Sequence, residues 1–92
     1  LAARAGVRPS IANPQLYFDV NVGGTLEILE AMRRHGCRKL VFASSSSVYG
    51  NSPRVPFTED DTAAEPISPY AASKRAAELL CYSYHHLYRF DI

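Results

Sequence analysis

The chain has 92 residues, which allows one domain at most, and 47% of them are hydrophobic while 21% are charged. That balance is typical of a packed globular chain and excludes an intrinsically disordered one. Ten Lys and Arg residues against nine Asp and Glu leave a formal net charge of +1, so charge favours neither nucleic acid nor an anionic membrane surface as a partner.

The cysteines and the apolar runs bear on the compartment. Cys37 and Cys81 lie far apart without C-x-x-C spacing or a cluster of metal ligands, so we expect no metal site, two reduced and buried thiols, and a cytoplasmic protein. No apolar run approaches the ~18 residues needed to cross a bilayer, and no signal-peptide pattern is present. Because Leu1 is not a start methionine and the last residues resemble the start of a strand, we expect truncation at both ends.

The first predicted element, after a short apolar start that Pro9 is expected to interrupt, is a helix over residues 14–35. Asn13 and Pro14 supply an N-cap and a proline at the first helical position, and Gly36 supplies a left-handed end. Helical spacing predicts two adjacent apolar stripes, which are Phe18, Val22, Leu29 and Met32, and then Tyr17, Gly24 and Ile28. So wide an apolar arc predicts cover on two sides, by a sheet and by another helix or subunit.

Polar and small residues interrupt the middle of this helix. Asn21 lies between the two stripes, where a polar side chain needs a buried partner. It is either a satisfied core amide or a residue that organises water or backbone near a cofactor, and both interpretations stay open. Gly23 and Gly24 likewise fit close approach by a neighbouring backbone or cofactor, or simply tight helix packing.

The next predicted element is a buried parallel strand over residues 39–44, because the run is short, apolar and partly β-branched or aromatic. Helix, short loop and strand make half of a βαβ unit, so the predicted fold class is α/β, part of a Rossmann-like doubly wound parallel sheet. Residues 44–47 are four serines at the carboxyl end of that strand, where ligands bind in such sheets. Their hydroxyls either hydrogen-bond a substrate alcohol or bond local backbone.

The last elements are an irregular loop and a second helix. Residues 50–68 are rich in proline and carry an acidic run without the ligand spacing of a calcium site, which predicts a long surface loop. Ser68 and Pro69 repeat the N-cap device and open a helix over residues 69–88. We assign no catalytic role to the three histidines, His35, His85 and His86.

Tyr70 and Lys74 are four residues apart and therefore share one face of the second helix. An ammonium group near a phenol stabilises the phenolate, which makes a tyrosine usable as a general base at neutral pH. Such a pair can also simply decorate a helix surface, so the pair gains weight only together with the serines.

Taken in order, the motifs of the chain resemble the extended short-chain dehydrogenase/reductase family over essentially the whole length. The matching segments are Leu1-Ala-Ala, Asn13-Pro14, Asn21-Val-x-Gly-Thr25, Ser44-Ser-Ser-Ser-Val-Tyr-Gly50 and Ser68-Pro-Tyr-Ala-Ala-Ser-Lys74. The resemblance implies NAD as cofactor, Ser45 as the catalytic serine, Tyr70 as the base and Lys74 as its partner. It also implies that Leu1, Ala2, Ala3 and Asn21, with Tyr70 and Lys74, bind the cofactor.

The residues after the catalytic serine separate reaction types in this family. Sugar dehydratases of this family carry Thr-Asp-Glu at these positions, and decarboxylases usually carry a glutamate before Val-Tyr-Gly. This chain has Ser46 and Ser47 there. The resemblance therefore implies an epimerase. Residues 4–11 and 81–88 look most like the UDP-glucuronate 4-epimerase branch, which implies a UDP-sugar substrate contacted by Ser45, Ser46, Ser47 and Tyr70. Arg89 stands where the family usually has glycine.

The resemblance also implies what this chain lacks. It contains no glycine-rich turn for a pyrophosphate and no substrate domain, so we expect residues 1–92 to be the central part of one NAD-binding domain, inactive alone. Helices 14–35 and 69–88 would form a homodimer surface. Two alternatives stay open: a UDP-glucose 4-epimerase or another NAD-dependent sugar-nucleotide epimerase or dehydratase, and a non-catalytic nucleotide-binding module.

Overall fold

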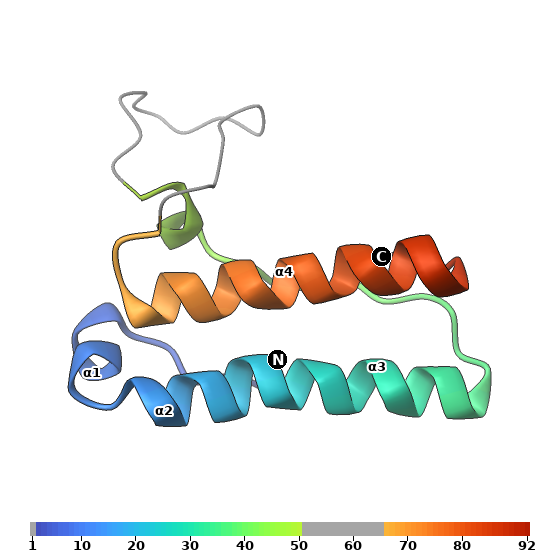
Figure 1. The fold of residues 1–92 in the computed structure, drawn as a ribbon, viewed down its shortest axis with the longest axis horizontal. Helices are drawn as coiled ribbons and strands as arrows, with labels where there is room; N and C mark the ends of the chain where they lie inside the picture. Colours follow the sequence, from blue (N-terminus) through green and yellow to red (C-terminus); the bar gives the residue numbers. More distant parts are fainter. Residues whose placement is uncertain (1, 51–65) are drawn as a thin grey trace.

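The computed structural model describes residues 2–50 and 66–92. In that part of the chain, two long helical rods, residues 14–35 (the first rod) and 69–88, lie side by side, and an extended segment returns along them (Figure 1). The elements are α1 (Val7–Ala12), α2 (Pro14–Tyr17), the π-helical η1 (Phe18–Gly23), α3 (Gly24–His35), the 3-10 helix η2 (Ser46–Tyr49) and α4 (Pro69–Tyr88). Most of the predicted loop 50–68, with its acidic run, lies outside the described residues.

Both predicted long helices are confirmed. Their ends are fixed by hydrogen bonds and backbone conformations of nearby residues. The side chain of Asn13 accepts a hydrogen bond from the backbone N–H of Leu16 at 3.3 Å. Gly36 ends the first rod in the left-handed conformation, with a φ of 71°. The side chain of Ser68 accepts from the N–H of Ala71 at 3.0 Å and starts α4.

A π-helical turn in the first rod shifts its buried face. Hydrogen bonds in η1 span one residue more than those of an α-helix, so the residues before it rotate relative to α3. Tyr17 and Asn21 are therefore buried together with Leu29, whereas Phe18 is 38% exposed. The predicted stripe of Phe18 with Leu29 was wrong, since it assumed an unbroken α-helical period. Ile28, from the second predicted stripe, is also half-exposed.

Helix α1 is a further departure from the sequence prediction. Pro9 was expected to interrupt the chain, yet it lies in the first turn of α1. A proline is tolerated there because the first backbone N–H groups of a helix have no partner within the helix. The short helix places Ser10, which is fully buried, against the start of α4.

Residues 39–44 do not form a regular strand in the part of the chain that the structure describes. One parallel bridge joins Lys39 to Asp91, with a hydrogen bond from the N–H of Leu40 to the carbonyl of Asp91 at 2.9 Å. Val41, predicted to be buried, is 96% exposed. The strand prediction was therefore wrong for this chain, because a ladder needs neighbouring strands and residues 90–92 offer a short one. The parallel direction agrees with an α/β unit.

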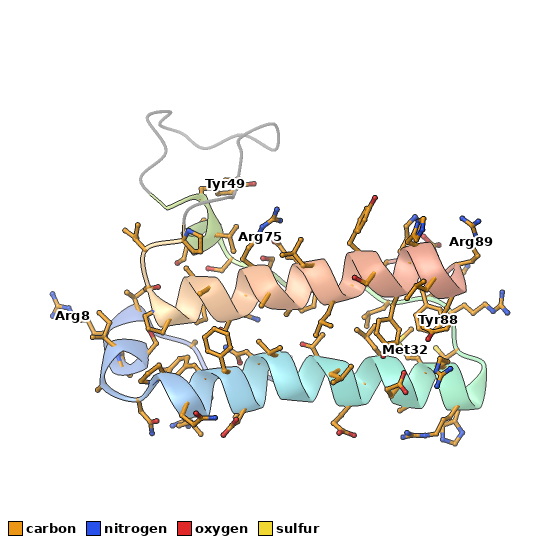
Figure 2. All side chains as sticks on the ribbon, viewed as in Figure 1. Arg8, Met32, Tyr49, Arg75, Tyr88 and Arg89 are labelled. Atoms are coloured by element: carbon orange, nitrogen blue, oxygen red, sulfur yellow. The ribbon has the colours of Figure 1, made fainter. Side chains whose placement is uncertain are left out.

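The hydrophobic core lies between the rods, towards their C-terminal ends. It consists of Leu29, Met32, Cys81 and Phe90, with Leu40, Phe42, Leu80 and Tyr84 packed against it. Figure 2 shows Met32 and Tyr88 at this same end of the two rods. Cys81 is buried as predicted, and burial raises the pKa of its thiol. Cys37 is exposed just after the turn at Gly36, so the prediction of two buried cysteines was wrong for Cys37.

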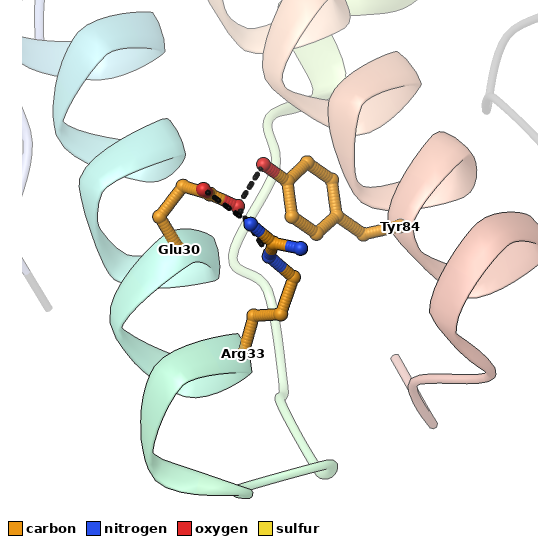
Figure 3. Close-up of polar contacts among 3 residues, drawn as sticks. All are labelled: Glu30, Arg33 and Tyr84. Atoms are coloured by element: carbon orange, nitrogen blue, oxygen red, sulfur yellow. Dashed lines mark hydrogen bonds and ion pairs between the residues drawn. The ribbon is translucent and has the colours of Figure 1, made fainter.

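A polar cluster crosses between the rods at the same end (Figure 3). The Tyr84 hydroxyl donates to the Glu30 carboxylate at 2.6 Å, and Arg33 pairs with the same carboxylate at 3.2 Å. The hydrogen bond to Glu30 raises the pKa of Tyr84 to about 12 and, in turn, lowers the pKa of Glu30. The cluster thus joins α3 to α4 where both rods end.

Within residues 2–50 and 66–92, no helix combines the length and apolarity that crossing a membrane requires. The same residues contain no group of three or more His, Cys, Asp and Glu side chains that could hold a metal ion.

Candidate active site

Lys74 is a buried cation on the second turn of α4, with 8% of its surface exposed. Its Nζ donates to the backbone carbonyl of Ala43 at 3.0 Å and lies 5.4 Å from the centroid of the Phe42 ring. The carbonyl and the ring face stabilise a charge that would otherwise be costly to bury. Because an ammonium has three N–H donors, Lys74 can still donate to a molecule beside it.

Tyr70 lies one turn before Lys74 and is held from the other side by α1 and the first rod. Its backbone N–H donates to the hydroxyl of Ser10 at 3.0 Å. Its ring packs edge-to-face on Tyr17, with centroids 6.2 Å apart. The Tyr17 hydroxyl donates to the carbonyl of Ala5 at 2.8 Å. The start of α4, and with it the Tyr70 ring, is therefore fixed by residues far away in the sequence.

Asn21 is a satisfied core amide, and it organises backbone at the same time. Its Oδ1 accepts from the N–H of Arg4 at 2.9 Å, and its Nδ2 donates to the carbonyl of Arg4 at 3.0 Å. The same Nδ2 donates to Ser73 Oγ at 3.0 Å, and Ser73 donates to the carbonyl of Tyr70 at 2.7 Å. One buried side chain thus fastens both the segment before α1 and the first turn of α4.

A cavity of about 510 Å³ lies between these elements, a size typical of small-molecule sites. It is lined by Ala2, Ala3, Ala5, Asn21, Thr25, Ile28, Leu40, Val41, Phe42, Ala43, Ser44 and Lys74. The structure therefore brings together Ala2, Ala3, Asn21 and Lys74 of the predicted cofactor set. Tyr70, also in that set, does not line this cavity, and Leu1 lies outside the described residues.

The three serines after Ser44, residues 45–47, lie outside the larger cavity. Ser45 caps η2, where its Oγ accepts from the N–H of Ser47 at 3.2 Å. Ser46 and Ser47 line a hollow of about 250 Å³ together with Val7, Gly50, Ile67 and Ser68, and none of these residues lines the larger cavity. Local bonding of Ser45 to backbone, one of the two interpretations left open, is therefore present.

Ser44 is the serine that reaches α4. Its hydroxyl donates to one carboxylate oxygen of Glu78, and the other oxygen pairs with Arg75 at 2.7 Å. Sequence reasoning missed Glu78, although it continues the row of Tyr70 and Lys74 at helical spacing. Sequence reasoning also missed Ser10, for which no local signal exists because its partner lies 60 residues away.

The family comparison covers the whole chain. The model of the GDP-mannose 4,6 dehydratase family matches residues 1–92. UDP-glucuronate 4-epimerase of Thermodesulfobacterium geofontis is 59% identical over 93 residues, which is 100% of this chain and 28% of that protein. The probable UDP-glucuronate 4-epimerase of Rhizobium meliloti is 46% identical over 89 residues, or 97% of this chain and 26% of that protein. The chain thus spans less than a third of these relatives.

Solved structures of the same kind superpose closely on the chain. UDP-glucose 4-epimerase from Brucella ovis in complex with NAD gives a TM-score of 0.93 at 36% identity, covering 98% of this chain and 27% of that one. UDP-N-acetylglucosamine 4-epimerase from Methanobrevibacter ruminantium M1, in complex with UDP-N-acetylmuramic acid, gives 0.91 at 40% identity, covering 99% and 29%.

These neighbours are Rossmann-fold enzymes, so the predicted α/β class holds at that level although the described residues form no regular sheet. The resemblance read from the ordered motifs is likewise confirmed. The chain belongs to the GDP-mannose 4,6 dehydratase family, within the extended short-chain dehydrogenase/reductases.

Proposed function

We propose that the protein carrying this chain is a nucleotide-sugar 4-epimerase that converts UDP-glucuronate to UDP-galacturonate. The observation that carries the proposal is Lys74, a buried ammonium at the wall of a 510 Å³ cavity and one helical turn from Tyr70. The 59% identity to a UDP-glucuronate 4-epimerase supports the choice of sugar. The serines at positions 46 and 47 support epimerisation over dehydration, because they supply no additional carboxylate.

The larger cavity fits NAD by the chemistry of its lining. Ile28 and Phe42 offer apolar surface to a flat ring, and Lys74 offers N–H donors to ribose hydroxyls. We propose that Ala2, Ala3 and Asn21 line the cofactor site, with Tyr70 and Lys74 at its reactive end. Bound NAD would supply the hydride exchange at C4 of the sugar.

The protein's own part in the reaction is to move one proton and to hold the sugar. Tyr70 takes the proton of the sugar 4-hydroxyl, while Ser45 hydrogen-bonds the same oxygen. Lys74, one helical turn further along α4, is the positively charged partner of Tyr70. After the 4-keto sugar has presented its opposite face, Tyr70 returns the proton to the oxygen at C4. Ser46 and Ser47 donate to the sugar carboxylate from the smaller hollow.

We also propose that the enzyme is a cytoplasmic homodimer. Phe18 and Leu26 on the first rod and Leu79 and Tyr82 on α4 are each more than a third exposed. A second copy that covers the faces of rods 14–35 and 69–88 would bury such side chains. Free Cys37 and Cys81 fit a reducing compartment. Sedimentation of the protein expressed from its complete reading frame tests the dimer, and a monomer would contradict it.

The deciding experiment is an NMR assay of UDP-glucuronate conversion by the protein expressed from its complete reading frame. We expect UDP-galacturonate to form, the Tyr70→Phe variant to form none, and the 92-residue chain alone to be inactive because it lacks a glycine-rich pyrophosphate turn. Conversion of UDP-glucose but not UDP-glucuronate would select the neutral-sugar epimerase. Tight NAD binding without conversion of any UDP-sugar would select the non-catalytic module.

A further inference from the structure

Two contacts tie the end of the 39–44 segment to one face of α4. Lys74 Nζ donates to the carbonyl of Ala43 at 3.0 Å, and one turn further on Glu78 accepts a hydrogen bond from the hydroxyl of Ser44. Arg75 holds the second oxygen of Glu78 at 2.7 Å, and the Arg75 and Glu78 side chains are 35% and 24% exposed. Each oxygen of the Glu78 carboxylate therefore has a partner, and its orientation is fixed from both sides.

The next residue along this segment is Ser45. In the proposed reaction its hydroxyl must reach the same sugar oxygen as Tyr70, and such steps are sensitive to displacements of about 1 Å. The hydroxyl of Ser45 accepts from Ser47 within its own turn, a contact that does not attach the turn to α4. The turn itself also packs on α4, with Val48 buried, and hydrogen bonds at Ala43 and Ser44 join the residues just before it to the same helix.

We propose that Glu78, held by Arg75, is a positioning residue: it anchors Ser44 to α4 and so sets where Ser45 stands relative to Tyr70. The inference rests on the proposed function for its catalytic consequence. Tyr70, Lys74 and Glu78 follow one another at four-residue spacing and share a helix face. One face of α4 thus carries the proposed base, its charged partner and the residue that anchors Ser44.

An ordinary surface ion pair is the competing explanation, because Arg75 and Glu78 are three residues apart on one helix and such pairs contribute little. The contact with Ser44 distinguishes the two explanations, since it joins segments 34 residues apart. The chain contains a matched comparison in Glu30, which pairs with Arg33 at the same three-residue spacing but is bonded to Tyr84 instead of the serine segment.

The test uses the protein expressed from its complete reading frame. For Glu78→Ala we expect kcat per folded enzyme to fall on the order of tenfold, with KM for the sugar and NAD affinity within about twofold. Ser44→Ala should cause the same loss, and the double variant no further loss. Glu78→Gln keeps an acceptor oxygen for Ser44 and should recover most of the rate. Glu30→Ala should leave kcat unchanged.

Backbone hydrogen exchange provides a readout that does not depend on turnover. We expect the amides of residues 45–48 to exchange faster in Glu78→Ala than in Glu30→Ala. Unchanged exchange there, or losses in Ser44→Ala and Glu78→Ala that add up in the double variant, would overturn the proposal. If the wild-type protein binds NAD but converts no sugar, the proposed function fails, and the exchange experiment alone then supports or overturns the anchor.

Discussion

The two ends of the helix pair differ in the contacts that dominate. Near Tyr70 and Lys74, single hydrogen bonds join side chains to backbone far away in the sequence, beside one ring pair, Tyr17 and Tyr70. At the opposite end the rings of Tyr84, Tyr88 and Phe90 pack with centroids 5.2 to 6.1 Å apart, beside one hydrogen bond between the helices, from Tyr84 to Glu30. Hydrogen bonds fix direction, whereas ring packing contributes mostly buried area. Changes at the first end should therefore impair chemistry, and changes at the second should lower stability alone.

The largest expected effect is at the first end. Removing the Tyr70 hydroxyl with Tyr70→Phe should lower kcat by roughly a thousandfold, within the range of general acid–base catalysis. The melting temperature should stay unchanged, because the ring and its contact with Tyr17 remain. Sugar turnover by NMR and thermal unfolding measure the two quantities. A variant that keeps most of its activity would show that another group takes the proton.

Asn21→Ala tests whether the hydrogen bonds of the first end also support the fold. The change removes one accepted and two donated hydrogen bonds and leaves both backbone groups of Arg4 without their partner. We expect the free energy of unfolding to fall by about 3 kcal/mol. Gln15→Ala, which removes an exposed hydrogen bond to Asp19 on the same rod, should change it by less than about 0.5 kcal/mol. Urea unfolding of both variants measures the difference, and equal losses would contradict the prediction.

The second end has a pH signature in Tyr84. The pKa of its hydroxyl is raised to about 12, chiefly by the hydrogen bond to Glu30, from the usual value of 10. The unfolded chain therefore loses this proton first as pH rises, so the contribution is complete below pH 10 and disappears by about pH 12. Between pH 10 and about pH 12, the free energy of unfolding should therefore fall less steeply for Tyr84→Phe than for the wild type. Parallel curves for wild type and variant, measured by urea unfolding, would contradict this assignment.

The smallest expected effect is at the end of α4. Arg89 has a left-handed φ of 60°, which is unfavourable for a residue with a side chain. Arg89→Gly should therefore raise the free energy of unfolding by about 1 kcal/mol. Gly36→Ala, at the equivalent position of the first rod with a φ of 71°, should lower it by a similar amount. A destabilising Arg89→Gly would mean that the arginine side chain makes a compensating contact.

Sequence patterns predicted what depends on neighbouring residues. The helix starts at Asn13 and Ser68 follow from side chains that cap their own helix, and the end at Gly36 follows from a glycine that adopts a left-handed backbone, so the chain carries that information locally. The absence of a regular strand over residues 39–44 could not be predicted in this way, because a strand depends on hydrogen bonds to other strands. Neither could the partners of Asn21, since Ser73 comes from another helix.

The same distinction between local and distant partners applies to the candidate site. Spacing alone put Tyr70 and Lys74 on one helix face, and the structure has both on the first two turns of α4. The order of motifs added Ala2, Ala3 and Asn21, which line one cavity with Lys74. Only the three-dimensional arrangement shows that Ser46 and Ser47 line a different hollow, because the 3-10 helix η2 begins at Ser46.

Because of the π-helical turn η1, the structure of the first rod depends more on how many residues the turn contains than on which residues they are. One residue deleted within Phe18–Gly23 would allow an ordinary α-helix to form there. Every position upstream would then turn by about a quarter of a revolution relative to α3, since successive residues of a helix are about 100° apart. Tyr17 would swing away from Tyr70 even where the deleted residue is not Asn21, the site residue in this stretch. Insertions and deletions in this stretch should therefore be tolerated far less well than substitutions.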